Sequence, residues 1–258
     1  MRSRARMGVA PYLLLSGLLT ATRGSPSVPA VACINATRLS RVIYVNMDHR
    51  RDRRKYMERH LAQLTVPLQR VAGPRVGVEQ AEALLPAWMA NQFSRARLLG
   101  TAGCLQSKLA VLRACLAERR AQPSAEHSLI LLLEDDYLVR KSKALQSLLR
   151  AHLTSAIGSG QMVCRPSVVR LDCWSDDVAA GSQLSMCNAS AVVRTCRCGG
   201  THAMLIPTWG LRPLLELYER RLGEADCVLA RLRDSYCLNA GIMLRHPSYW
   251  DNDIPKVK

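Results

Sequence analysis

Residues 129–136 read LILLLEDD and hold the strongest structural signal in the chain. Five consecutive aliphatic residues are typical of a strand buried on both faces, as in a parallel sheet covered by helices. The segment ends in Glu134, Asp135 and Asp136, at the edge where such sheets bind ligands. Hard divalent cations prefer carboxylate oxygens, so the acidic end predicts a metal site. An ordinary polar strand end without metal is the alternative from this segment alone.

The apolar pattern on either side alternates between strand and helix periodicity. Strands are predicted at 41–47, 68–72, 167–171, 201–206 and 242–244, and helices at 48–64, 78–89, 103–119, 144–157, 211–222 and 226–232. This alternation predicts an α/β fold with a mostly parallel central sheet, in a single domain over residues 39–258. The glycine fingerprints of dinucleotide enzymes and P-loop NTPases are absent from the sequence, which argues against both classes.

The N-terminus carries the features of a secretory signal. Arg2, Arg4 and Arg6 precede an apolar stretch at 9–21, and small residues follow up to Gly24. We therefore expect a signal peptide at 1–24, or a retained signal anchor, and a linker at 25–38. Asn35 and Asn188 stand in N-glycosylation triplets. Together these features predict the secretory pathway, in the lumen of the endoplasmic reticulum or Golgi or outside the cell, with no stable membrane span unless the signal is uncleaved.

The chain has ten cysteines, and disulfides are the default expectation in an oxidising compartment. Many fall in 172–200, which shows no clear periodicity and is predicted to be a stapled loop. Zinc held by Cys196, Cys198 and His202 is the alternative, although this spacing is not that of a standard finger. Cys104 and Cys115 lie in an apolar helical pattern and are candidates for simple buried thiols.

The formal charge of +16 favours an anionic partner such as a nucleotide phosphate, an acidic glycan, a membrane surface or nucleic acid. Aromatic residues make up only 5%, so stacking platforms are scarce and nucleic acid is disfavoured. The predicted strand 41–47 opens into a basic helix start with Arg50 and Arg53, which is a good phosphate site. Asp48 is suited to accept hydrogen bonds from a sugar or base. A solvated cationic helix face is the alternative for this segment.

Five segments, taken together, resemble glycosyltransferase family 25, which includes lipopolysaccharide transferases and procollagen galactosyltransferases. They are RVIYVNMDHRRDRR (41–54), GCLQSKLAVL (103–112), LILLLEDD (129–136), THAMLIPTWGLRPLLEL (201–217) and HPSYWDNDIP (246–255). They occur in the family's order and extend over nearly the whole mature chain. The chain departs from the family at Lys108, where the family usually has His, and at Met204, near a usual Tyr.

The resemblance implies a GT-A-like, Rossmann-type nucleotide-sugar fold and the transfer of a sugar from a nucleotide-sugar donor. Galactose from UDP-galactose is the first candidate, with Mn²⁺ as cofactor and a protein or glycan hydroxyl, for example in a collagen-like acceptor, as the target. Glu134, Asp135 and Asp136 would hold the metal against the diphosphate, with Asp136 also catalytic. The nucleotide-sugar site would be lined by Asn46, Asp48, Arg50, Arg53, Ser107 and Lys108.

Asp226 resembles a family aspartate and is the candidate catalytic residue on the acceptor side, as a base. A helix N-terminal Asp that stabilises the helix dipole is an equal alternative. His202 is a further candidate for a residue facing the sugar, although a histidine near a strand is more often structural. Two other functions stay open for the whole chain. One is a catalytically inactive relative that binds glycans or a partner, and the other is a basic polyanion-binding module.

Overall fold

The structure is a computed structural model that describes residues 38–121, 128–139, 142–171, 192–193, 201–238 and 242–245. The predicted signal at 1–24, the linker before Arg38, both glycosylation triplets, Cys196 and Cys198 lie outside these ranges. Among the described residues, no helix is both long enough and apolar enough to cross a bilayer. Cys104 and Cys115 are free thiols, as expected, whereas Cys164, Cys227 and Cys237 are disulfide-bonded.

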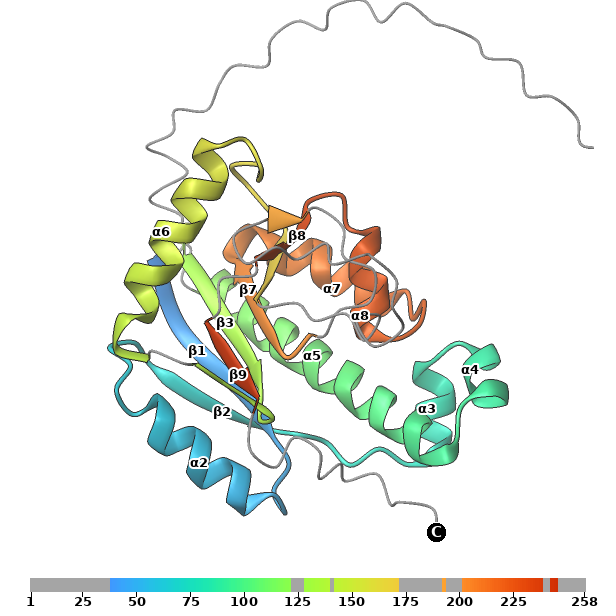
Figure 1. Cartoon of the computed structure of the whole chain (residues 1–258). Helices are drawn as coiled ribbons and strands as arrows, with labels where there is room; N and C mark the ends of the chain where they lie inside the picture. The colour runs from blue at the N-terminus through green and yellow to red at the C-terminus, as the bar shows by residue number, and fades with distance from the viewer. Residues whose placement is uncertain are drawn as a thin grey trace, which may run out of the picture.

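A mixed sheet forms the centre of the molecule (Figure 1). Its strands follow the order β2-β1-β3-β7-β5-β8-β6. Their bounds are β1 (Arg38–Asn46), β2 (Leu68–Ala72), β3 (Ser128–Glu134), β5 (Val168–Leu171), β6 (Val192–Val193), β7 (Ala203–Pro207) and β8 (Ser235–Leu238). β1 pairs in parallel with β2 and β3, and β5 pairs in parallel with β8. The prediction of an α/β fold with a mostly parallel sheet is therefore confirmed.

Two of these strands run against the others. β7 lies between β3 and β5 and is antiparallel to both, and β6 is antiparallel to β8. A small second sheet pairs β4 (Tyr137–Val139) with β9 (Met243–Arg245). β3 ends at Glu134 and β4 begins at Tyr137. The acidic segment therefore lies where the chain leaves the central sheet and enters the small one.

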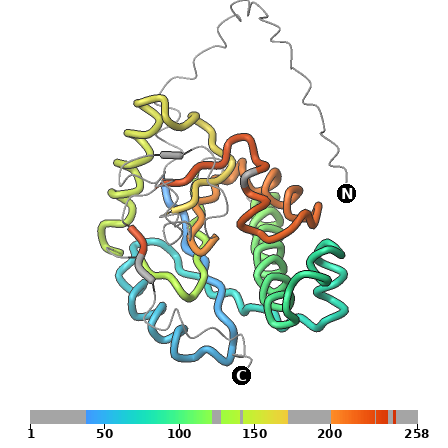
Figure 2. The backbone as a smooth tube through the Cα atoms, turned by 45° about the vertical axis from the view of Figure 1, so that its right-hand side comes forward, coloured from blue at the N-terminus to red at the C-terminus, as the bar shows by residue number. Residues whose placement is uncertain are grey.

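Helices cover both faces of the central sheet. On one face lie α2 (Arg51–Leu61) and α6 (Leu145–Gly158), and on the other lie α3 (Val78–Leu84), α4 (Ala87–Gln92), α5 (Arg95–Ala121), α7 (Leu211–Glu219) and α8 (Ala225–Val228). Short 3₁₀ turns are at Ser142–Ala144, Thr208–Gly210 and Leu229–Arg231. In Figure 2 the sheet lies between α6 and the long α5.

The side chains of β3 explain why the sheet needs two helical layers. Leu131 and Leu133 pack into the core under α2 and α6, whereas Ile130 and Leu132 pack into the core under α5 and α7. All four are at most 2% exposed. Alternate residues of a strand point to opposite faces, so an all-aliphatic strand is stable only when both faces are covered. The sequence prediction for residues 129–133 is thus confirmed.

Candidate functional site

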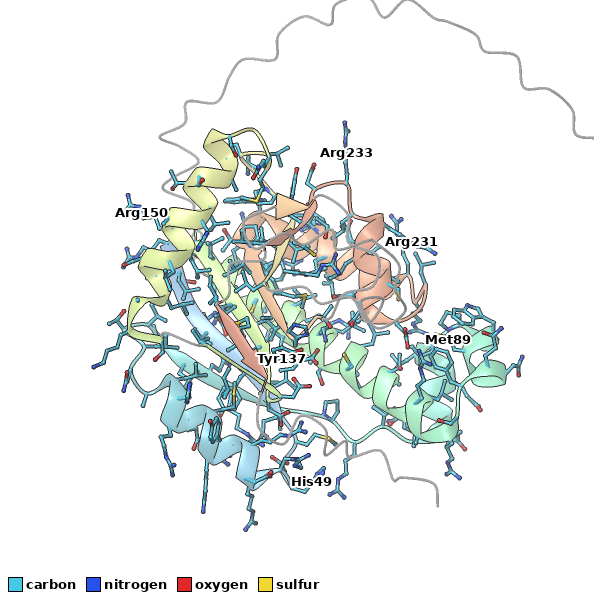
Figure 3. The ribbon with its side chains drawn as sticks, viewed as in Figure 1. His49, Met89, Tyr137, Arg150, Arg231 and Arg233 are labelled. Carbon is cyan, nitrogen blue, oxygen red and sulfur yellow. The ribbon has the colours of Figure 1, made fainter. Side chains whose placement is uncertain are left out.

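A pocket of about 540 Å³ lies at the carboxyl ends of β1 and β3. The parallel register pairs Val45 with Glu134, which brings the polar ends of both strands to the same edge. The remaining walls come from the turn after β2, at Gly73–Val76, and from the N-terminal half of α5. Figure 3 shows His49 at the start of α2 and Tyr137 directly after the acidic segment, both at this end of the sheet. Ligands of open α/β sheets bind at such strand ends.

Asp135 ties three elements together below the pocket. Its Oδ2 accepts a hydrogen bond from Asn46 Nδ2 at 2.7 Å, and its Oδ1 forms an ion pair with Arg53 Nη1 at 3.0 Å. Asn46 also accepts a hydrogen bond from Arg70 at 3.2 Å. Asn46, Arg53 and Asp135 are each at most 9% exposed. Both oxygens of Asp135 are therefore engaged in joining β1, α2 and β3.

Glu134 is paired with Lys108, which α5 presents from the opposite wall. Lys108 Nζ also donates to Cys104 Sγ at 2.8 Å, and Thr201 Oγ1 lies 3.3 Å from Glu134 Oε1. Burial by itself would lower the pKa of Lys108, but the neighbouring acidic groups outweigh it and hold this pKa well above its usual range. Likewise, burial would raise the pKa of Glu134, and the ammonium of Lys108 overcomes it and lowers that pKa. The pair is thus charged on both sides.

Asp136 differs from its two neighbours because one of its oxygens has no partner among the described residues. Its Oδ1 is buried and makes no hydrogen bond with any of them, and the side chain lines the pocket. Burial, reinforced by the charges of Glu134 and Asp135, raises the pKa of Asp136 from 3.8 to about 7. A buried carboxylate oxygen without a donor is costly, which makes Asp136 the natural contact for a cation that enters the pocket.

The acidic segment suits a metal that is shared with a ligand rather than a cage made by protein alone. No group of three His, Cys, Asp or Glu side chains among the described residues is arranged to hold a metal ion. Mg²⁺-like cations, however, are usually bound by one or two carboxylates together with substrate phosphates. Asp136 Oδ1 fits that arrangement, whereas Glu134 and Asp135 already have cationic partners.

Asp226 lies in a second pocket of about 280 Å³, next to the first. Its Oδ1 accepts a hydrogen bond from Thr201 Oγ1 at 2.6 Å, and Thr201 also contacts Glu134. Burial raises the pKa of Asp226, although Lys108 opposes this effect. The two acids predicted to be catalytic therefore belong to neighbouring pockets that share Gly100 and Cys104 in their walls.

The other predicted site residues divide into two groups. Asn46, Arg53, Ser107 and Lys108 line the larger pocket, whereas Asp48 and Arg50 do not. Asp48 is paired with Arg70, which lowers the pKa of Asp48, and Arg50 is paired with Asp52 at 3.0 Å. His202 is buried and stacked on Tyr137, with ring centroids 3.6 Å apart.

Two arginines at the site carried no signal in the sequence, one in the pocket wall and one beside it. Arg75 follows the Gly73-Pro74 turn, lines the pocket and makes no ion pair among the described residues. Arg70 lies on β2 and reaches the end of β1. Both arginines sit in a segment with no motif, so only the order β2-β1-β3 brings them to the site.

In comparisons with known proteins, no family model matched the chain and no curated protein matched its sequence. The resemblance to glycosyltransferase family 25 therefore stays a prediction from the five segments.

Proposed function

We propose that this protein is a metal-dependent glycosyltransferase with a GT-A-like fold that uses a UDP-sugar, with UDP-galactose as the first candidate. The observation that carries the proposal is the buried Oδ1 of Asp136, which has no hydrogen-bond partner in the described part of the chain and lies in a pocket at the carboxyl ends of β1 and β3. The resemblance of five ordered segments to family 25 supports the same assignment. A protein or glycan hydroxyl, for example in a collagen-like protein of the secretory lumen, is the proposed acceptor.

The charges around the pocket suit the departure of a nucleoside diphosphate. Negative charge develops on the phosphate oxygens as the sugar leaves, and fixed cations stabilise it. Arg75 has no ion-pair partner in the described part of the chain and lines the pocket, so its guanidinium is available for a phosphate. Arg53 and Lys108 each pair with a carboxylate of the acidic segment, so their charges offset those of Asp135 and Glu134. A divalent cation held by Asp136 would supply further charge stabilisation at the diphosphate.

The apolar part of the same pocket suits the nucleoside. Val45, Met47, Pro74, Val76 and Leu99 line it, and apolar walls with a few polar groups are typical of small-molecule sites. In this arrangement the base lies against the apolar walls and the diphosphate lies toward Asp136. Asp226, in the adjoining pocket, is then the proposed base on the acceptor side.

A donor screen of the purified chain tests the proposal. We expect UDP binding and slow hydrolysis of a UDP-sugar that depend on Mn²⁺ in the native protein, and loss of both in Asp136→Asn. Glu216→Gln is the matched control, because Glu216 is an exposed acid on α7. Absence of Mn²⁺-dependent UDP binding in the folded native chain would refute the proposal.

A second candidate function is favoured by the Lys108–Glu134 pair. This ion pair neutralises one of the three acids, and Lys108 replaces a histidine that is usual in the family. A catalytically inactive relative that keeps nucleotide or glycan binding would have the same pocket. Binding of UDP with no turnover of any UDP-sugar and any acceptor would favour this function over the transferase.

A further inference from the structure

Helix α5 separates the two neighbouring pockets. Its Leu99 and Gly103 face the larger pocket, whereas Arg97 and Thr101 face the smaller one. Gly100 and Cys104 belong to the walls of both. Residues four apart on a helix lie one above the other, so these two small residues form the ridge between the pockets.

Gly100 has no side chain, so the space above the helix between the two pockets is open at this position. Glycine is the least favourable helix residue apart from proline, yet Gly100 lies well inside α5, which spans Arg95–Ala121. A Cβ added at Gly100 would meet no atom within 4 Å, so close packing does not explain the glycine. A larger side chain would instead project into the space where the two pockets meet.

The two pockets offer complementary chemistry on either side of Gly100. The larger one contains Arg75, whose guanidinium suits the oxygens of a phosphate. The smaller one contains Asp226 and the Glu224–Arg97 ion pair. Carboxylates accept hydrogen bonds from hydroxyl groups, so a hydroxyl-rich group suits this second pocket.

We infer that one elongated ligand occupies both pockets, with a nucleoside diphosphate in the larger pocket and its sugar ring in the smaller one. Gly100 is the specificity-determining residue, because it leaves the passage through which the sugar extends. This inference rests on the proposed function and deepens it by assigning the sugar to a defined subsite and by naming the residue that limits its size.

The test compares ligands that fill one pocket with ligands that fill both. Dissociation constants are measured by calorimetry with Mn²⁺ for UDP, UDP-galactose and UDP-N-acetylglucosamine, on the full chain with and without Gly100→Leu. We expect Gly100→Leu to weaken the binding of UDP-galactose by at least about tenfold more than it weakens the binding of UDP. Gly100→Ala should weaken UDP-N-acetylglucosamine more than UDP-galactose, because the acetamido group is bulkier.

Gly158→Leu is the matched control, since Gly158 also lies in a helix and has open space at its Cβ position. It should leave all three constants unchanged, and melting curves show whether each variant is folded. If Gly100→Leu weakened the binding of UDP and of UDP-galactose equally, or weakened neither, this inference would be overturned and the proposed function would stand. A native protein that binds no UDP would overturn the proposed function and, with it, this subsite.

Discussion

At the scale of single residues, the three acids of the LILLLEDD segment have separate roles. Glu134 is paired with Lys108, Asp135 is held by Arg53 and Asn46, and Asp136 has an oxygen without a partner among the described residues. β3 ends at Glu134, and Asp135 and Asp136 lie in the turn that follows it, so the three acids meet different neighbours. Charge balance therefore leaves Asp136 as the acid with a buried oxygen available to a ligand.

Asp136 should lower the stability of the ligand-free protein at alkaline pH. Its pKa is about 7 in the folded state against 3.8 ordinarily, so between these values the native state holds a proton that the unfolded state has lost. The protonated carboxyl of Asp136 therefore contributes its full share to the free energy of unfolding below about pH 4, and this contribution is lost as the pH rises through about 7. We expect Asp136→Asn to raise the free energy of unfolding by about 1 kcal/mol or more at about pH 8, and with it the melting temperature, and to raise neither at about pH 4.

Thermal melts of both proteins across this pH range check the prediction, with Glu216→Gln as the control. Equal stabilisation at both pH values would contradict the assigned pKa. The same substitution is expected to abolish Mn²⁺-dependent UDP binding, so a gain in stability would accompany a loss of function.

Lys108 should be needed for stability because it neutralises Glu134. Lys108→Met would leave the half-buried Glu134 without its cation, and we expect a loss of about 2–3 kcal/mol in the free energy of unfolding, below the range for a fully buried pair. The double variant Lys108→Met with Glu134→Gln should recover most of that loss, since no charge then remains unpaired. Urea unfolding of the single and double variants gives the coupling energy. Additive losses would mean that the two side chains do not act as a pair.

At the scale of elements, the sequence predicted most strands and a mostly parallel sheet, but not which strands are antiparallel. The aliphatic run became the central β3, and the predicted strand 41–47 lies within β1 and the residue after it. Strand 201–206 was also predicted, but the buried residues of β7 have the same composition in either direction, so its antiparallel pairing left no trace in the sequence. The predicted helix 78–89 is instead α3 and α4, because Leu85 is extended before Pro86.

The junction between α7 and the sheet should be the position least tolerant of added volume. A Cβ at Gly210 would collide with the backbone carbonyl of Ser167, just before β5. Backbone atoms cannot move aside as a flexible side chain can, so we expect Gly210→Ala to lower the free energy of unfolding by about 3 kcal/mol. Gly158→Ala, which meets nothing within 4 Å, should change it little. Chemical denaturation of the two variants checks the difference, and equal effects would show that the close approach is not rigid.

At the scale of the whole molecule, the family resemblance assigned Asn46 and the acidic segment to one site, and the parallel pairing of β1 with β3 brings Asn46 and Asp135 into contact. The sequence did not predict that Lys108 would neutralise Glu134, since that contact depends on how far α5 extends along β3. Nor did the spacing of motifs place Asp226 in a separate, adjoining pocket. Such side-chain pairings depend on the relative position of packed layers, which single-residue patterns do not encode.

The net charge of +16 should affect polyanions and nucleotides differently. Arg51, Lys55 and Arg59 form an exposed stripe at four-residue spacing on α2, suited to a polymer with many negative charges. Raising NaCl from about 50 to about 200 mM should weaken heparin binding by about 10³-fold if six or more charges are neutralised. A diphosphate engages fewer charges in a partly enclosed pocket, so we expect UDP affinity to fall by less than about tenfold.

Titrations of both ligands across this salt range, with and without Arg51→Ala/Lys55→Ala/Arg59→Ala, separate the two modes of binding. The triple variant should reduce the salt dependence of heparin binding and leave the UDP constant unchanged. If UDP affinity instead fell as steeply as that of heparin, or if heparin displaced UDP from the native chain, the pocket would not be the site that selects the anion. The basic polyanion-binding module would then account for the charge better than a transferase does.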